Sequence, residues 1–202
     1  FGTDGAQVMF ICEPANNLVH REVLNYDGGT ITSRRHPDDV EREFIASEDN
    51  WFRPSMARTG PDGALYVVDM YRLVLEHPEW IPAEIARGLD LRGGEDRGRI
   101  YRISKSGAST RPPKGGTTIL KPTEAMGSAN GWMRDTAQRL LIERKETSAV
   151  AELKLLLGAA PAVRVQAAFT LMQLGAMTAD EVFALIKPLV PQVRAGALTA
   201  TG

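Results

Sequence analysis

The chain has 202 residues, of which 43% are hydrophobic and 24% charged, and its formal net charge is −1. This composition predicts a globular protein of one or two domains. No apolar run approaches the ~18 residues of a membrane helix, and no basic stripe carries interleaved aromatic residues, so neither a membrane segment nor nucleic-acid binding is expected. Because Cys12 is the single cysteine, the chain has no internal disulfide and no CxxC or CxxCH motif.

Charge and composition change along the chain. Residues 1–107 carry 13 Lys/Arg against 18 Asp/Glu, whereas residues 108–202 carry 11 against 7. Residues 108–127 are rich in Ser, Thr, Pro, Lys and Gly, which is typical of a linker. We therefore predict a strand domain at 1–107, a linker at 108–127 and a helical domain at 128–202. The chain starts at Phe1 rather than Met, so we expect a piece of a longer protein, with any signal peptide outside it.

The strand domain contains short apolar or alternating runs separated by turn residues. Asp27-Gly28-Gly29 predicts a hairpin, because glycine adopts positive φ without steric strain. Cys12, which follows Phe10 and Ile11, is expected to be a small core residue. Evenly spaced short strands indicate antiparallel blades of a β-propeller, here only partly present. The predicted strands span residues 6–13, 18–27, 30–36, 42–47, 64–68 and 97–103.

The helical domain repeats with a period of 30 residues. Arg134, Arg164 and Arg194 recur at that interval, each preceded by an apolar residue and followed three positions later by alanine. Partner helices are predicted at 148–157 and 179–189, so the pattern indicates a solenoid of HEAT-like helical hairpins. The recurring arginine suits either an acidic protein partner or, as we favour, bonds to carbonyls or carboxylates of the next repeat. The fold class is thus α+β in two parts.

Two helix signals accompany the repeat. Pro161 stands where the first turn of a helix tolerates a missing N–H. Thr178 and Glu181 have the spacing of a capping box.

Residues 51–72 place polar side chains directly after the apolar strand 64–68. Asp69, Tyr71 and Arg72 could line a cleft as an acid, an orienting hydroxyl and an anion clamp. Asp69 could equally join Arg53, Arg72 or Arg99 in a buried ion network. His20, on another strand, is a candidate general base, although a structural hydrogen bond is the interpretation we favour.

Three further features have simpler interpretations. Asp62 in Pro-Asp-Gly is a turn former. Trp51 and Trp80 are expected to pack in the core or between blades rather than stack on a sugar. Gly93-Gly94 makes a weak phosphate loop, since no helix follows it.

Several longer motifs occur together: CEPANNLVHRE, EFIASEDNWFRP, GPDGALYVVDMYR, HPEWIP, LRGGEDRGRIYRI and NGWMRDTAQRLLIER. The combination resembles a family of large secreted planctomycete and verrucomicrobial proteins, labelled membrane-bound dehydrogenases or haem-binding domain proteins. The resemblance covers residues 1 to about 145. It implies a six-bladed propeller similar to soluble quinoprotein sugar dehydrogenases, then HEAT-like repeats and often a cytochrome c domain. Haem c would therefore bind in a domain outside this segment.

The resemblance also implies a cofactor site. Quinoprotein sugar dehydrogenases carry two arginines, spaced Arg-x-Arg, upstream of a Pro-Asp-Gly turn, and both contact pyrroloquinoline quinone. Guanidinium groups suit this tricarboxylate because they pair bidentately with carboxylates. When the turns are aligned, Arg53 takes the first position and Ser55 the second. Arg53 and, less directly, Arg72 are therefore the expected cofactor-binding residues, while no metal site is expected.

Two functions from different classes follow. The first is a periplasmic or secreted quinoprotein-type dehydrogenase that oxidises a sugar or alcohol and passes electrons to a haem elsewhere. The second is a non-catalytic scaffold whose propeller binds a glycan or protein while its helical repeats dock a protein partner. The serine at position 55 favours the scaffold. A calcium-dependent lactonase is a third possibility, but its Glu, Asn and Asp ligands are not apparent. Open sheet edges predict dimerisation or a larger assembly.

Overall fold

The computed structural model describes residues 7–27, 30–107 and 121–187. The predicted repeat around Arg194 and the predicted turn at Gly28-Gly29 lie outside these ranges. The chain is a mixed α+β protein with antiparallel sheets and several helices. Its contacts divide it into a strand unit, drawn from residues 1–25, 31–60 and 64–110, and a helical unit drawn from 26–30, 61–63 and 111–202.

The first sheet is built from four antiparallel strands. β1 (Val8–Glu13), β2 (Leu18–Asp27) and β3 (Thr30–Arg35) are neighbours in that order, and β4 (Ile45–Ala46) pairs with β2. The predicted strand at 42–47 is thus reduced to two residues. Asn17 closes the turn between β1 and β2 with φ 58°, and its side-chain amide donates to the carbonyls of Asn50 and Phe52.

The second sheet has the order β5-β6-β7, all antiparallel, and comprises β5 (Pro54–Thr59), β6 (Leu65–Asp69) and β7 (Arg99–Ile103). The sequence pattern predicted β6 and β7 but not β5, which mixes polar and apolar residues and is mostly exposed. Pro54 is tolerated because it is the first residue of an edge strand. Gly63, with φ 76°, forms the turn between β5 and β6.

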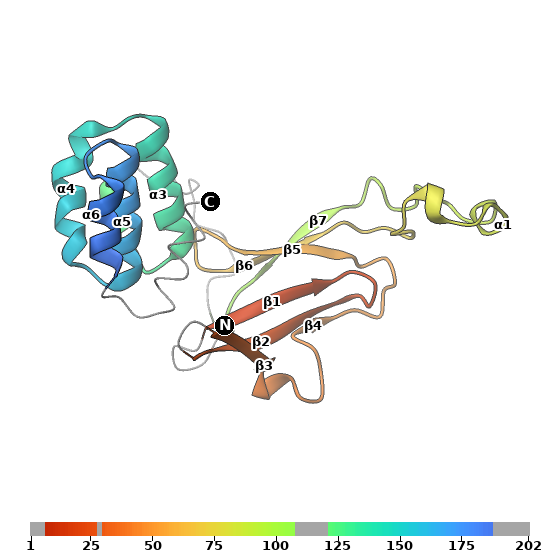
Figure 1. The fold of residues 1–202 in the computed structure, drawn as a ribbon. Coiled ribbons are helices and arrows are strands. Elements are labelled where there is room, and N and C mark those ends of the chain that lie inside the picture. The colour runs from red at the N-terminus through yellow and green to blue at the C-terminus, as the bar shows by residue number, and fades with distance from the viewer. Residues whose placement is uncertain (1–6, 28–29, 108–120, 188–202) are drawn as a thin grey trace. The chain divides into compact units, whose positions relative to one another are not determined.

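The two sheets of the strand unit enclose one apolar core, and Figure 1 shows them as stacked layers. Val19 from the first sheet meets Leu65 and Val67 from the second, and each is at most 2% exposed. Cys12 packs against this cluster, as predicted, and partial burial raises the pKa of its thiol. The alternation of β6 therefore directs one face of the second sheet inward.

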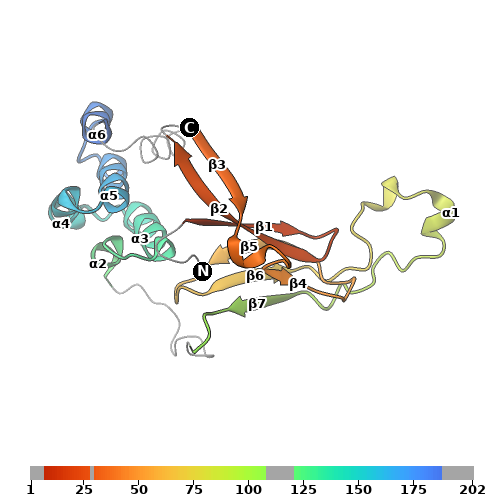
Figure 2. The ribbon, with the colours of Figure 1, turned by 90° about the horizontal axis from the view of Figure 1, so that it is seen from below.

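Residues 70–98 leave the second sheet at the end of β6 and return to it at β7. We call this segment the arm; Figures 1 and 2 show it reaching beyond the strands. It contains a 3-10 turn, η2 (Pro78–Trp80), and one short helix, α1 (Ala83–Ala86). The backbone of Leu73 donates to the carbonyl of Gly93, which joins the two ends of the arm.

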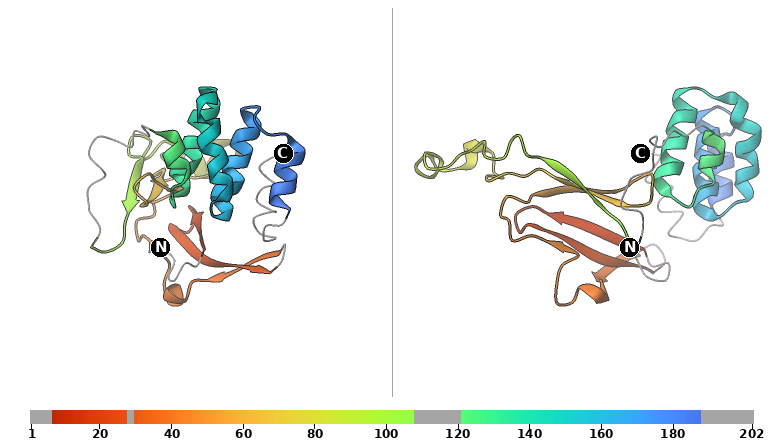
Figure 3. Two further views of the ribbon diagram at one scale, coloured as in Figure 1. Left: turned by 90° about the vertical axis from the view of Figure 1, so that its left-hand side faces the viewer. Right: turned by 180° about the vertical axis from the view of Figure 1, so that it is seen from behind.

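The helical unit begins with α2 (Pro122–Met126) and α3 (Gly131–Glu143), and its helices lie side by side in Figure 3. Pro161 is the first residue of α5, as predicted, and Thr178 with Glu181 forms the predicted capping box of α6. The remaining segments are η3 (Thr147–Ala149), α4 (Val150–Leu155), η4 (Leu156–Gly158), α5 (Pro161–Gln173) and α6 (Ala179–Ile186).

Helix α2 corrects the predicted extent of the linker. It lies within residues 108–127, yet Met126 is completely buried with Leu141, Leu153 and Leu171 in the helical core. The sequence pattern missed it because five residues are too few to show helical periodicity.

The repeated arginines have a structural role near the start of their helices. Arg134 donates to the carbonyls of Ser128 and Ala129, and its Nε to the side chain of Gln166 on α5. Arg164 donates to the carbonyl of Ala159. The hydrogen-bond partners of these two arginines are therefore mainly carbonyls of the loop that precedes each helix. Only the bond from Arg134 to Gln166 reaches the next repeat, where all the partners were predicted to lie. Among the helices that the structure describes, none is both long and apolar enough to cross a membrane.

Candidate functional site: the polar end of strand β6

Asp69, the last residue of β6, is the buried centre of a polar cluster and is 1% exposed. Its Oδ1 accepts hydrogen bonds from the backbone N–H groups of Arg53, at 2.8 Å, and Tyr71, at 2.9 Å. An aspartate that binds nearby backbone N–H groups stabilises a turn. Here the turn places Tyr71 at φ 50°, a left-handed conformation that few residues other than glycine adopt.

Gly94 packs directly on this turn. It has φ 89°, and a Cβ at this position would lie 2.3 Å from the carbonyl oxygen of Tyr71. Only glycine fits both the conformation and the space. The pair Gly93-Gly94, considered above as a weak phosphate loop, is therefore explained by packing at the base of the arm.

The side chain of Arg53 joins two separate segments of backbone. Its Nε donates to the carbonyl of Arg72 at 2.9 Å, its Nη1 to that of Pro14 at 2.9 Å, and its Nη2 to that of Leu73 at 3.2 Å. Since a guanidinium group has five N–H donors in a rigid fork, these bonds fix both its position and its orientation. Arg53 thus ties the turn after β1 to the start of the arm.

Arg72 makes a second bridge of the same kind. Its Nη1 donates to the carbonyl of Gly94 at 2.5 Å, and its Nη2 lies 3.4 Å from that of Glu95. The side chain therefore links the outgoing and returning ends of the arm.

The two expected cofactor-binding residues do not fit a quinone clamp in this arrangement. A tricarboxylate requires guanidinium donors directed at the ligand, but those of Arg53 and Arg72 are directed at backbone carbonyls. Ser55 is exposed and its hydroxyl lies 3.4 Å from the carbonyl of Val68. Pyrroloquinoline quinone stays an expectation of the resemblance alone, and we assign no redox step to these residues.

Arg99 lies over the aromatic part of the cluster. Its guanidinium carbon is 3.9 Å from the centre of the Tyr71 ring, which is the geometry of a cation–π contact. Trp51 contacts the same tyrosine, with ring centres 5.7 Å apart. The Tyr71 hydroxyl donates to Asp49 at 3.0 Å, and this bond raises the pKa of the hydroxyl because it stabilises the protonated form.

The second carboxylate oxygen of Asp69, Oδ2, has fewer contacts than Oδ1. No donor among the described residues makes a hydrogen bond to Oδ2, and the Nε of Arg99 lies 3.7 Å away. Of the two interpretations of Asp69, the structure matches the ion network: Arg53 contributes its backbone N–H and Arg99 its charge. Oδ2 is not exposed.

His20 belongs to a different cluster, on the first sheet. Its Nδ1 lies 2.7 Å from Glu43 and its Nε2 3.3 Å from Glu22. Burial alone would raise the pKa of the Glu43 carboxyl, but bonds from His20 and Arg35 outweigh it and leave the pKa below its usual range. Both ring nitrogens of His20 therefore face carboxylates of its own sheet, and none of its hydrogen bonds connects it to Asp69.

Sequence reasoning missed the best-formed ion pair of the strand unit. Arg21 donates from Nε and Nη2 to the two oxygens of Asp39, at 2.8 and 2.9 Å, and both residues are buried. Burial raises the pKa of Asp39, but the bonds from Arg21 lower it by more, so the pKa lies below the usual value of an aspartate. The ring centre of Phe44, a partly buried neighbour, lies 4.9 Å from the guanidinium carbon. The only sequence signal was Asp39 following His36-Pro37, a turn pattern.

Trp80 corrects another expectation. It was predicted to pack in the core or between blades, but it is 80% exposed. It lies on the arm, beside an apolar groove of about 340 Å³ lined by Leu73, Val74, Glu76, Trp80, Ile81, Pro82, Ile85 and Leu89. The segment 77–82, with the sequence HPEWIP, thus lies mostly at the surface of the strand unit.

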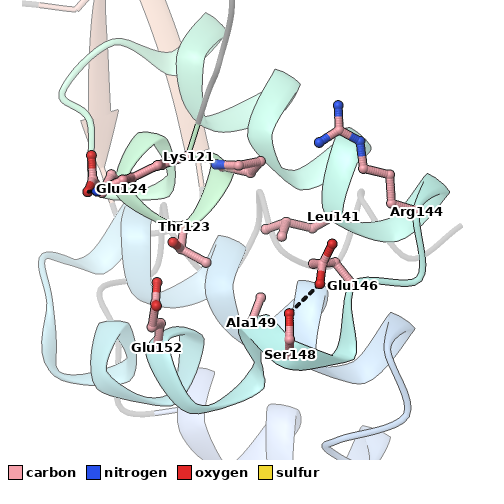
Figure 4. Close-up of a pocket in the computed structure, with 10 residues that line it drawn as sticks. Lys121, Thr123, Glu124, Leu141, Arg144, Glu146, Ser148, Ala149 and Glu152 are labelled. Atoms are coloured by element: carbon pink, nitrogen blue, oxygen red, sulfur yellow. Dashed lines mark hydrogen bonds and ion pairs between the residues drawn. The ribbon is translucent and has the colours of Figure 1, made fainter.

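The helical unit has a pocket of its own, also of about 340 Å³. Figure 4 shows Glu152 directed toward Thr123, and Ser148 bonded to Glu146. Lys121 pairs with Glu124 at 2.8 Å. The polar side chains that pair in this pocket are therefore close neighbours in sequence, Ser148 with Glu146 and Lys121 with Glu124.

The described residues contain no group of three or more His, Cys, Asp or Glu side chains placed to hold a metal ion. The fold is that of a mixed α+β protein. In the β6 cluster, the side chains of Arg53 and Arg72 bind backbone carbonyls of the chain itself. A family model for a domain of unknown function, DUF7133, matches residues 1–107, and the chain belongs to this family. No curated protein and no solved structure matches the chain.

Proposed function

We propose that this chain is a non-catalytic recognition scaffold from a secreted or periplasmic protein of the quinoprotein-dehydrogenase type. The strand unit supplies the recognition surface, and the helical unit docks a protein partner. In this proposal, oxidation of a sugar or alcohol and electron transfer to haem c depend on residues outside this segment. The assignment to that type of protein comes from the resemblance of residues 1 to about 145.

One observation carries the scaffold proposal: the guanidinium of Arg53 is bound to backbone carbonyls of the turn after β1 and of the start of the arm. Arg72 is engaged in the same way, and Asp69 is buried under Arg99. Arg53, Arg72 and Asp69, which the sequence indicated as candidate cofactor-binding or catalytic residues, therefore hold the backbone in place. The strand unit also exposes large apolar side chains, above all Trp80, which is 80% exposed.

The finer architecture belongs to the same proposal. The two antiparallel sheets, joined by a core around Val19 and Val67, suit the terminal blades of a β-propeller. The equivalent roles of Arg134 and Arg164, thirty residues apart, suit the first units of a HEAT-like solenoid.

Quinone binding to the chain tests the proposal. The chain is titrated with pyrroloquinoline quinone, and binding is followed by equilibrium dialysis and tryptophan quenching. We expect no saturable binding that depends on Arg53. Saturable binding that is lost in Arg53→Met, but kept in Arg58→Met on the adjoining strand β5, would overturn the scaffold assignment.

Arrays of polysaccharides and of displayed peptides supply the positive test. We expect the chain to bind members of at least one array, and Arg53→Ala to retain that binding at a temperature where it is folded. A chain that binds nothing on either array, or whose binding disappears with Arg53 alone, contradicts a scaffold with its recognition surface elsewhere.

A further inference from the structure

The arm carries an apolar groove that no other described side chain fills. Its walls are aliphatic apart from Trp80 and Glu76. Trp80 is 80%, Ile85 53% and Leu89 37% exposed. Large apolar side chains gathered around a groove mark an interaction site more often than single exposed ones do.

The groove is shaped before any partner arrives. Pro78 and Pro82 restrict the backbone on either side of Trp80. The N–H of Trp80 donates to the carbonyl of His77, and that of Ile85 to the carbonyl of Pro82, at 2.9 Å each. At its base, the arm is tied by Arg72 to Gly94. Because little conformational freedom is left to lose, binding here carries a small ordering penalty.

The charge around the groove is one-sided. Residues 73–90 contain four acidic residues, Glu76, Glu79, Glu84 and Asp90, and one basic residue, Arg87. The side chain of Glu79, next to Trp80, is 85% exposed, and the ring of His77 lies 4.0 Å from it. Within the part of the chain that the structure describes, Glu76 makes no ion pair although it lines the groove.

From this surface we infer that the arm docks a basic peptide segment of a partner protein, whose apolar side chains enter the groove beside Trp80. The apolar walls bind its leucine- or phenylalanine-like anchors, and Glu76 and Glu79 attract lysines or arginines that flank them. The inference rests on the proposed scaffold function and names the partner class of its recognition surface.

Two other occupants suit the groove less well. A saccharide needs several polar groups to bind its hydroxyls, and Glu76 is the one charged residue that lines the groove. A second copy of the chain on a two-fold axis would place the acidic rim of the arm against itself, which like-charge repulsion opposes.

A peptide library displayed on phage tests the inference with the complete 202-residue chain. Twelve-residue random peptides are selected on the chain and counter-selected on Trp80→Ala. We expect enriched sequences that combine Leu, Phe or Trp with Lys or Arg. Enrichment of acidic sequences, or failure to recover any clone that depends on Trp80, overturns the inference.

Affinities of the enriched peptides provide the quantitative test, by fluorescence anisotropy with fluorescein-labelled peptide. Trp80→Ala should weaken binding by about 30-fold, as expected for a tryptophan hot spot. Glu76→Gln combined with Glu79→Gln should weaken it several-fold and reduce its salt dependence. Ile100→Ala, at a 65% exposed apolar residue of β7 outside the arm, should leave it unchanged.

The outcomes separate the two proposals. Because Trp80 is mostly exposed, Trp80→Ala should remain folded, which circular dichroism verifies. If the chain binds polysaccharides but no peptide through the arm, the peptide inference fails and the scaffold function stands. If Arg53-dependent quinone binding is found while the arm still binds basic peptides, the scaffold assignment fails and the docking surface stands.

Discussion

Replacing Arg53 by methionine distinguishes a structural arginine from one reserved for a ligand. Methionine keeps much of the aliphatic length but removes the three contacts to the carbonyls of Pro14, Arg72 and Leu73, at 2.9, 2.9 and 3.2 Å. A hydrogen bond from a charged group contributes about 1.5–3 kcal/mol, and these carbonyls are only partly buried, so water replaces part of the loss. We expect a decrease in the free energy of unfolding of about 2–4 kcal/mol in total.

Urea unfolding followed by tryptophan fluorescence and circular dichroism measures this change. The melting temperature should fall by about 4–16 °C, because each kcal/mol corresponds to about 2–4 °C in a chain of this size. Arg58→Met is the matched control, since Arg58 is an exposed residue of β5, the strand that begins directly after Arg53. It should change stability by less than about 0.5 kcal/mol. If the two variants are equally stable, Arg53 does not hold the backbone and the structural interpretation is refuted.

Three other predictions concern stability. Asp39→Asn should remove part of the pH dependence of the free energy of unfolding. The bond from Arg21 depresses the pKa of Asp39, so its contribution to stability is present above about pH 4, the ordinary pKa of an aspartate, and is lost as the pH falls further. Urea midpoints from pH 2 to 7 measure the difference from wild type. Thr178→Ala should lower stability by about 1 kcal/mol through loss of the capping box, and Thr178→Ser should restore most of it. Met126→Ala should lower the stability of the helical unit by about 2–5 kcal/mol because it leaves a cavity in a fully buried site; an effect below 1 kcal/mol would show that α2 does not belong to the core.

Local patterns predicted the elements that depend on local physics. Strand β6 follows from the apolar run after Gly63, and the cap of α6 from the spacing of Thr178 and Glu181. β5 was missed because an edge strand with one half-buried alanine, Ala57, among exposed residues shows no apolar alternation. α2 was missed because its burial depends on Met126 contacting helices far along the chain.

The sequence predicted which residues lie together in the candidate site, but not what each side chain binds there. The sequence placed Asp69, Tyr71 and Arg72 together, and they do lie together at the end of β6. It could not predict that Arg53 would bind backbone carbonyls, because the donors of a guanidinium are satisfied by whichever acceptors the tertiary fold supplies. The exposure of Trp80 was unpredictable for the same reason: apolar residues on a projecting segment have no local signature that separates them from core residues.

The pairing of Asp69 with Arg99 in neighbouring strands has an evolutionary consequence. The two ends of the arm are held next to each other by the sheet itself, so the segment between them can lengthen, shorten or change sequence while the strands keep their register. Loop closure depends only weakly on length, by about 0.6 kcal/mol for each doubling. The sheet and the arginines at the base of the arm can therefore keep the framework constant when the sequence of residues 73–90 changes.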